Sequence, residues 1–240
     1  METIRGARRN AMIRRVLPRK GKFITIEGLD GCGKSTQLTK LADFLAGSGF
    51  DVLVTREPGG TEIGDRIRAL LLDSSTAGLS PMAEMALMFA ARAQHLHEVI
   101  LPALQHGKVV LCDRFTDSTE AYQGGGRKLG SEPVLELHRV LCGDVWPEAT
   151  VLMDSDPAMS VARARRRNRD RSAAAGCEPD ENRFEQESRA FFERVHEAYM
   201  AIARREPQRV IVVDARGSPE ATHKRIIAAL ERHLQLRTGR

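Results

Sequence analysis

Short apolar runs recur along this chain, separated by segments long enough to form helices. Each run is rich in Val, Ile and Leu and is almost continuous in apolar character, which is typical of strands buried on both faces of a sheet. The runs cover residues 23–27, 51–55, 108–112, 150–153 and 209–213. This alternation predicts an α/β fold with a central five-stranded parallel sheet flanked by helices.

Three of the intervening segments carry further information. Gln37 to Leu45 reads as a helix that follows a glycine-rich turn, and Pro81–Gln105 reads as a long helical stretch. Residues 163–183 differ, because they contain six arginines near their start and few large apolar side chains. We therefore expect this third segment to be a mobile, solvated excursion rather than core.

Length and composition favour a single globular domain over residues 23–240. The chain has 240 residues, 42% of them hydrophobic and 29% charged, which is ordinary for a soluble protein. No apolar run approaches the roughly 20 residues that would cross a bilayer, so we expect no membrane partner.

The net charge of +5 has a local origin. Residues 1–22 hold eight Lys and Arg side chains and one acid, so the rest of the chain is close to neutral. We expect a basic, disordered N-terminal extension there and no nucleic-acid partner. An organellar transit peptide, or a misassigned start upstream of Met12, are the alternatives.

The four cysteines show neither C-x-x-C spacing nor a histidine at zinc-ligand distance. We interpret them as free thiols of a cytoplasmic protein. Cys32 lies inside the motif described next.

Residues 28–35 read Gly-Leu-Asp-Gly-Cys-Gly-Lys-Ser, which is the P-loop pattern G-x-x-x-x-G-K-S between a predicted strand and a predicted helix. Its backbone N–H groups wrap nucleotide phosphates, Lys34 reaches the β- and γ-phosphates, and the Ser35 hydroxyl ligates Mg²⁺. The fold prediction therefore becomes a P-loop NTPase-type three-layer sandwich that binds ATP with Mg²⁺. The expected ATP-binding residues are Gly28, Leu29, Asp30, Gly31, Cys32, Gly33, Lys34, Ser35 and Thr36.

Acidic residues end several of the predicted strands, where open parallel sheets bind ligands. Asp113 and Asp154 are candidates for the site, whereas Asp214 fits a helix cap or a solvated loop equally well. Asp113 would accept from waters around Mg²⁺, or would pair with Arg114. Arg114 would hold a phosphate oxygen or form that structural pair.

Two further segments have open interpretations. Thr55–Thr61 contains Pro-Gly-Gly, which forces a turn at the ligand side of the sheet or merely connects two elements. The arginine cluster places Arg163, Arg167 and Arg171 on one helical face. Such a cluster suits a solvated face, a nucleic-acid contact, or a lid that closes positive charge over a phosphoryl group in transfer.

Together, the segments GLDGCGKST, TREPGGT, LMFAARAQH, DRFTDSTEAYQGGGR and NRFEQESRAFF resemble bacterial thymidylate kinases in order and spacing. The resemblance extends from about Phe23 to the C-terminus. It implies an arginine-rich lid at about 163–183, a homodimer, and transfer of the γ-phosphoryl of ATP to dTMP.

The resemblance also implies roles for individual residues. Phe89 would stack on the thymine ring, Arg92 would hydrogen-bond the base, and Arg114, assisted by Arg56, would hold the acceptor phosphate. Tyr122 would exclude a 2′-hydroxyl. The same pocket would be lined by Ser118, Thr119 and Gln123.

Catalytic roles follow in the same way. Asp30 matches a family acid near the transferred phosphate, and Lys34 and Arg114 complete the charged set. Some relatives carry a basic residue in the P-loop, which this chain lacks. The resemblance therefore places the catalytic cation in the lid, where Arg163 and Arg167 are the candidates. Asn182-Arg183 stands where relatives often have Asp-Arg, and the lid is longer.

Rival functions are disfavoured by specific features. A regulatory GTPase would need Asn-Lys-x-Asp, and none of the asparagines is followed by lysine. A nucleic-acid-binding module would need a base-stacking pattern, but aromatic residues make up only 5% of the chain. Among kinases, dUMP, dCMP and UMP are the alternative acceptors.

Overall fold

The computed structural model describes residues 21–76, 78–175, 183, 184 and 186–234. Its sheet has five parallel strands in the order β2-β3-β1-β4-β5. Those strands are β1 Lys22–Glu27, β2 Val52–Arg56, β3 Val109–Asp113, β4 Ala149–Asp154 and β5 Val210–Asp214. The predicted five-stranded parallel sheet is confirmed.

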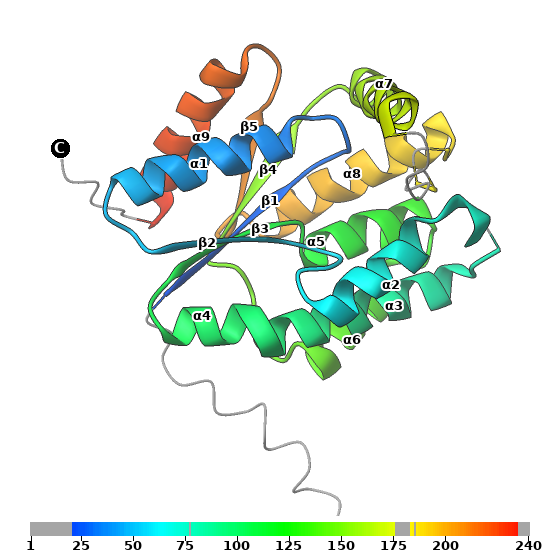
Figure 1. Cartoon of the computed structure of the whole chain (residues 1–240), viewed down its shortest axis with the longest axis horizontal. Helices are drawn as coiled ribbons and strands as arrows, with labels where there is room; N and C mark the ends of the chain where they lie inside the picture. Colours follow the sequence, from blue (N-terminus) through cyan, green and yellow to red (C-terminus); the bar gives the residue numbers. More distant parts are fainter. Residues whose placement is uncertain (1–20, 77, 176–182, 185, 235–240) are drawn as a thin grey trace, which may run out of the picture.

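Helices cover both faces of the sheet, as Figure 1 shows. Helices α1 and α9 lie on one face, and α3, α4, α6 and α8 lie on the other. The helices with eight or more residues are α1 Lys34–Gly47, α2 Glu62–Leu72, α3 Pro81–His95, α6 Ser131–Leu141, α7 Pro157–Ala175, α8 Arg189–Arg205 and α9 Pro219–Leu234. The shorter elements are η2 Ser74–Thr76, η3 Leu96–Ile100, α4 Leu101–Gln105, α5 Thr116–Thr119 and η4 Glu120–Gly126. The three-layer sandwich is also confirmed.

Successive side chains of β1 point to opposite faces of the sheet, so the core has one part on each face. Ile24 and Ile26 of β1 point toward α1 and α9, whereas Phe23 packs with α3, α4 and α6. The edge strands are less covered: Val54 of β2 is 46% exposed and Val212 of β5 is 42% exposed. The expectation of burial on both faces therefore holds for the central strands β1, β3 and β4 and fails at the edges.

Local sequence explains where several helices begin. The hydroxyls of Thr61, Ser80 and Ser188 accept from the first-turn N–H groups of α2, α3 and α8. The predicted helix over 81–105 is present, but its middle is a π-helix, η3, which directly precedes the turn that contains Pro102. Helix α1 differs from α2, α3 and α8 because Gly33 precedes it and no side chain caps it.

Two sequence boundaries need correction. Lys22 already belongs to β1, and Gly21 donates its N–H to the Leu104 carbonyl, so the extension cannot include these two residues. The prediction for residues 1–20 lies outside the described residues. The segment 163–183 is not simply a solvated excursion, because α7 runs to Ala175 and Arg183 is 5% exposed. None of the helices in the described part of the chain is long and apolar enough to span a membrane.

Candidate active site

The P-loop connects β1 to α1 at the carboxyl edge of the sheet. Lys34 is buried, and its Nζ donates to the carbonyls of Gly28 at 3.1 Å and Leu29 at 2.9 Å. No side chain occupies the N-cap of α1. The first N–H groups of this helix are therefore available to an anion, as phosphate binding requires.

At two positions of the P-loop, neighbouring backbone lies so close that only glycine fits. A Cβ at Gly28 would lie 2.8 Å from the Met153 carbonyl oxygen, and a Cβ at Gly31 would lie 2.1 Å from that of Ser160. Both residues have positive φ, of 137° and 80°. The second contact places the first turns of α7 directly against the P-loop.

A cleft with a volume of about 720 Å³ opens beside the P-loop. Ser35 of α1 and Asp113 at the end of β3 both line it, together with Arg56 and Asp65. Asp113 Oδ1 is buried and has no hydrogen-bond partner among the described residues. Ser35 and Asp113 thus bring a hydroxyl and a carboxylate to one cleft, and such a donor set suits Mg²⁺ and its water shell.

Arg114 lies at the centre of the charged groups. Its Nη2 donates to Asp30 Oδ1 at 2.7 Å and to the Tyr122 hydroxyl at 3.2 Å. Its Nη1 donates to Ser118 Oγ at 2.8 Å and to the Tyr199 hydroxyl at 3.1 Å. The backbone of Arg114 has φ of 72°, which is rare for a residue with a side chain and indicates a geometry imposed by the surroundings.

This cluster shifts the ionisation of its members. Burial opposes ionisation of Asp30, but the charges of Arg114 and Lys34 outweigh it and hold the pKa of that carboxyl below its usual range. Burial raises the pKa of the Tyr122 phenol. Asp30 is therefore an anion and Tyr122 a neutral hydrogen-bonding group at physiological pH.

Glu27 lies beneath this cluster and is completely buried. Its carboxyl group accepts from Phe115 N, Ser118 Oγ and the Tyr199 hydroxyl. Burial, together with the negative charge of Asp117, raises the pKa of Glu27 to about 7. A carboxyl group that changes charge near neutral pH thus supports the side chains that surround Arg114.

The predicted base-binding residues lie together on α3. Arg92 is 2% exposed, and its guanidinium lies 4.7 Å from the Phe89 ring centroid and 5.1 Å from that of Phe115. Its Nε donates to Glu57 at 2.7 Å and its Nη2 to Thr119 at 2.9 Å. Arg92 Nη1 is buried and, within the described residues, makes no hydrogen bond. Phe89 itself is fully buried.

Other predicted residues have different neighbours. The Gln123 amide donates to Glu84, a buried carboxylate that also pairs with Arg127 and Arg183. Arg56 is 58% exposed and lies 3.5 Å from Asp65. The structure therefore places Gln123 in a buried ion-pair network and Arg56 at the open cleft.

The two remaining strand-terminal acids differ. Asp154 accepts from His196 Nε2 at 2.8 Å, beside α8. Asp214 pairs with Arg216 at 2.7 Å and is 43% exposed. Asp214 is thus a solvated residue at the end of β5, and the side chain that accepts from the first turn of α9 is Ser218 instead.

The lid arginines lie on α7. Arg163 donates to Ser160 Oγ at 3.3 Å, and Arg165 donates to the Glu187 carbonyl at 2.9 Å. Arg167 lies on the same helix. The residues beyond Ala175 that belong to the predicted lid, 176–182, lie outside the described residues, and the catalytic role of Arg163 and Arg167 stays a prediction.

Sequence reasoning assigned no role in this site to Glu27, Glu57, His95 or Tyr199. Glu27 could have been found, because an acid directly before a P-loop must lie at the ligand edge of the sheet. His95 could also have been found, since it lies three residues after Arg92 on the same helical face. Tyr199 carries no local signal, because α8 is brought to the site only by packing.

Comparisons with known proteins agree with this geometry. The family model described as Thymidylate kinase matches residues 26–226. A thymidylate kinase from Desulfosudis oleivorans is 49% identical over 211 residues, which cover 88% of this chain and 96% of that protein. One from Pelobacter propionicus is 48% identical over 208 residues, covering 87% and 93% of the two chains.

A solved structure is similar as well. The crystal structure of thymidylate kinase from Ehrlichia chaffeensis is 31% identical and covers 88% of this chain and 98% of its own, with a TM-score of 0.68. Sequence and fold therefore agree over most of both chains, and this chain belongs to the thymidylate kinase family.

Proposed function

We propose that this chain is a nucleoside monophosphate kinase that transfers the γ-phosphoryl of ATP to dTMP, giving dTDP and ADP for dTTP synthesis. One observation carries the proposal: Arg114 donates to Asp30 of the P-loop at 2.7 Å. Arg114, which would bind the acceptor phosphate, therefore lies directly beside the P-loop, which would bind the phosphates of ATP. Two phosphate sites in contact are what direct phosphoryl transfer requires.

Catalysis by this arrangement is alignment combined with charge neutralisation. Lys34 would exchange its contacts with the Gly28 and Leu29 carbonyls for phosphate oxygens. The acceptor phosphate is already ionised, so no general base is needed. Arg163 and Arg167 of the lid would add positive charge and exclude water.

Ser35 would hold Mg²⁺ directly and Asp113 would hold it through water. Bound with ATP, the ion would neutralise charge on the β- and γ-phosphate oxygens. The unsatisfied Asp113 Oδ1 and the shared cleft support this assignment.

The acceptor would lie between α3 and the loop that follows β3. Arg114 and Arg56 would bind its phosphate, Tyr122 would adjoin the sugar, and Arg92 would donate to the base from Nη1. Phe89, Ser118, Thr119 and Gln123 complete the proposed pocket. Nε and Nη2 of Arg92 bind Glu57 and Thr119, whereas Nη1 has no partner among the described residues, which supports a ligand contact there.

The decisive experiment measures ADP release with Mg·ATP and, separately, dTMP, dUMP, dCMP or UMP. We expect dTMP to be preferred, with dUMP lower by about 10- to 200-fold, because a methyl group in an apolar pocket contributes only about 1–3 kcal/mol. Preference for any other acceptor would overturn the substrate assignment.

We further propose that the enzyme is a homodimer and acts in the cytoplasm. Helices α3 and α6 pack against each other and expose Met82 (53%), Val140 (64%) and Leu141 (38%). Apolar exposure of this kind favours self-association. Light scattering on the purified chain tests it, and a monomer at micromolar concentration would refute the dimer.

A further inference from the structure

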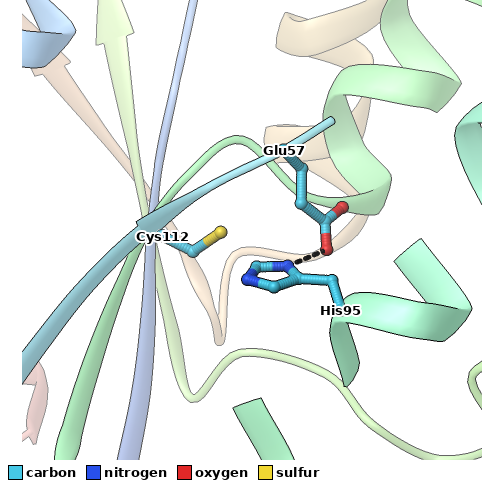
Figure 2. A group of neighbouring side chains, drawn as sticks. All are labelled: Glu57, His95 and Cys112. Atoms are coloured by element: carbon cyan, nitrogen blue, oxygen red, sulfur yellow. Dashed lines mark hydrogen bonds and ion pairs between the residues drawn. The ribbon is translucent and has the colours of Figure 1, made fainter. Parts of the chain in front are cut away.

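Glu57, His95 and Cys112 meet in the core beneath the proposed base site. Their ligating atoms all lie within 4.8 Å of one another, and Figure 2 shows the three side chains converging from different elements. Glu57 follows β2, His95 ends α3 and Cys112 belongs to β3. All three are buried. The cluster therefore joins three elements at one point.

Both Glu57 oxygens and both ring nitrogens of His95 already have hydrogen-bond partners within the protein. Glu57 accepts from Arg92 Nε at 2.7 Å through one oxygen and from His95 Nδ1 at 3.0 Å through the other. The opposite ring nitrogen, Nε2, lies 2.6 Å from Thr55 Oγ1. Because an ionised carboxylate only accepts, Nδ1 carries the proton, and in the neutral ring Nε2 accepts from the threonine hydroxyl.

Cys112 does not act as a metal ligand in this arrangement. Its thiol donates to the Arg114 carbonyl at 3.0 Å, and burial raises the pKa of the thiol well above its usual value. A metal needs the thiolate, and it would also have to displace Arg92 or Thr55 from its partner. The bonds present thus favour a positioning network over a metal centre.

The space around the His95 imidazole is left by a glycine. A Cβ at Gly60 would lie 2.6 Å from His95 Nε2 and 2.7 Å from Cδ2. The second glycine of the TREPGGT segment therefore admits the imidazole. Thr55 and Gly60 line the cleft beside the P-loop, so His95 connects the wall of that cleft to Glu57.

We infer that His95 is a positioning residue for recognition of the acceptor base, acting through Glu57 on Arg92. Glu57 and Thr119 fix two arms of the Arg92 guanidinium, and the Phe89 and Phe115 rings hold its plane. Nη1 has no hydrogen-bond partner among the described residues and is left for a ligand. The inference rests on the proposed function, in which Arg92 binds the base.

Two substitutions of His95 test its two hydrogen bonds separately, the one to Glu57 and the one to Thr55. In His95→Asn the amide nitrogen replaces Nδ1 and keeps the bond to Glu57. In His95→Gln it replaces Nε2 and keeps only the Thr55 end. Because a hydrogen bond to a charged group is lost only in His95→Gln, we expect that variant to weaken dTMP binding roughly 10-fold, and His95→Asn by about 3-fold or less.

The readouts are the Kd of dTMP by calorimetry and the KM values for dTMP and ATP, with the KM for ATP expected to change by less than about 2-fold. His138→Asn is the matched control, because His138 is equally buried and lies 2.8 Å from a threonine hydroxyl, that of Thr116. It should lower thermal stability and leave dTMP binding unchanged.

Equal dTMP affinity in both His95 variants and the wild type would overturn the inference. Stoichiometric Zn²⁺ binding by the wild-type chain that Cys112→Ser abolishes would also overturn it, in favour of a metal centre. A wild-type chain that binds dTMP without phosphorylating it would refute the proposed function instead, and the calorimetry would still decide the role of His95.

Discussion

Arg114 donates from Nη2 to Asp30 Oδ1 across 2.7 Å and so connects the loop after β3 to the P-loop. A carboxylate at this position neutralises the arginine while no phosphate is bound, and it fixes the guanidinium beside the donor cradle. The acceptor phosphate would therefore meet a cation that is already oriented, and binding would require little reordering of the side chain.

Replacing Arg114 by lysine should weaken acceptor binding selectively. A single ammonium cannot maintain the bonds that the guanidinium makes to Asp30, Ser118 and both tyrosines. We expect the KM for dTMP to rise roughly 10- to 100-fold at saturating ATP. Arg216→Lys, an exposed control paired with Asp214, should leave it unchanged. An unaltered KM in Arg114→Lys would mean that this arginine only braces the P-loop.

Lys34→Met should abolish phosphoryl transfer while preserving the fold. Methionine retains most of the buried stem of the side chain but loses the charge that would reach the phosphates. We expect kcat to fall by at least about 10²- to 10³-fold. Circular dichroism and thermal melting check that the variant is folded. Turnover near the wild-type rate would remove Lys34 from the mechanism.

Phe89 needs two variants, because it is fully buried in the core between the sheet and α3. Phe89→Ala should cost about 3–5 kcal/mol of stability through the cavity it leaves. Phe89→Leu keeps most of the volume, so it isolates the loss of the aromatic face. If the ring stacks on thymine, Phe89→Leu should raise the KM for dTMP about 3- to 10-fold. An unchanged KM would show that the ring is core only.

Glu27→Gln should change how stability depends on pH. The folded chain holds the Glu27 proton up to about pH 7, whereas an ordinary glutamate releases it near 4.5. The folded state therefore binds more protons in this interval, and wild-type stability falls as pH rises through it. Relative to wild type, the glutamine variant should gain of the order of 3 kcal/mol between these limits and nothing more above them. Urea denaturation of both proteins at several pH values measures this, and parallel curves would contradict the raised pKa.

The fold could be predicted from sequence because its main signals are local. Continuous apolar strands and a P-loop between strand and helix are signals that act within a few residues of one another. The solvated character expected for residues 163–183 was wrong at Arg183, because its burial depends on Glu84 and the Leu71 carbonyl, which are distant in sequence.

The site could be predicted in outline but not in its pairings. Motif positions predicted that Lys34, Ser35 and Arg114 lie near the carboxyl ends of the strands, and the structure places them there; their roles stay predictions. The partners of Arg114 and Arg92 could not be predicted. Tyr199 comes from α8 and Glu57 from the turn after β2, and only tertiary packing brings them to these arginines.

The contact between Gly31 and the Ser160 carbonyl limits how this enzyme can change. Any side chain at position 31, including a basic one, would meet the backbone of α7 before it reached a nucleotide. A basic residue substituted at position 31 alone therefore cannot supply the charge that we propose comes from the lid arginines. A side chain at this position would also require a change in the first turns of α7, so two stretches of sequence that are far apart along the chain constrain each other here.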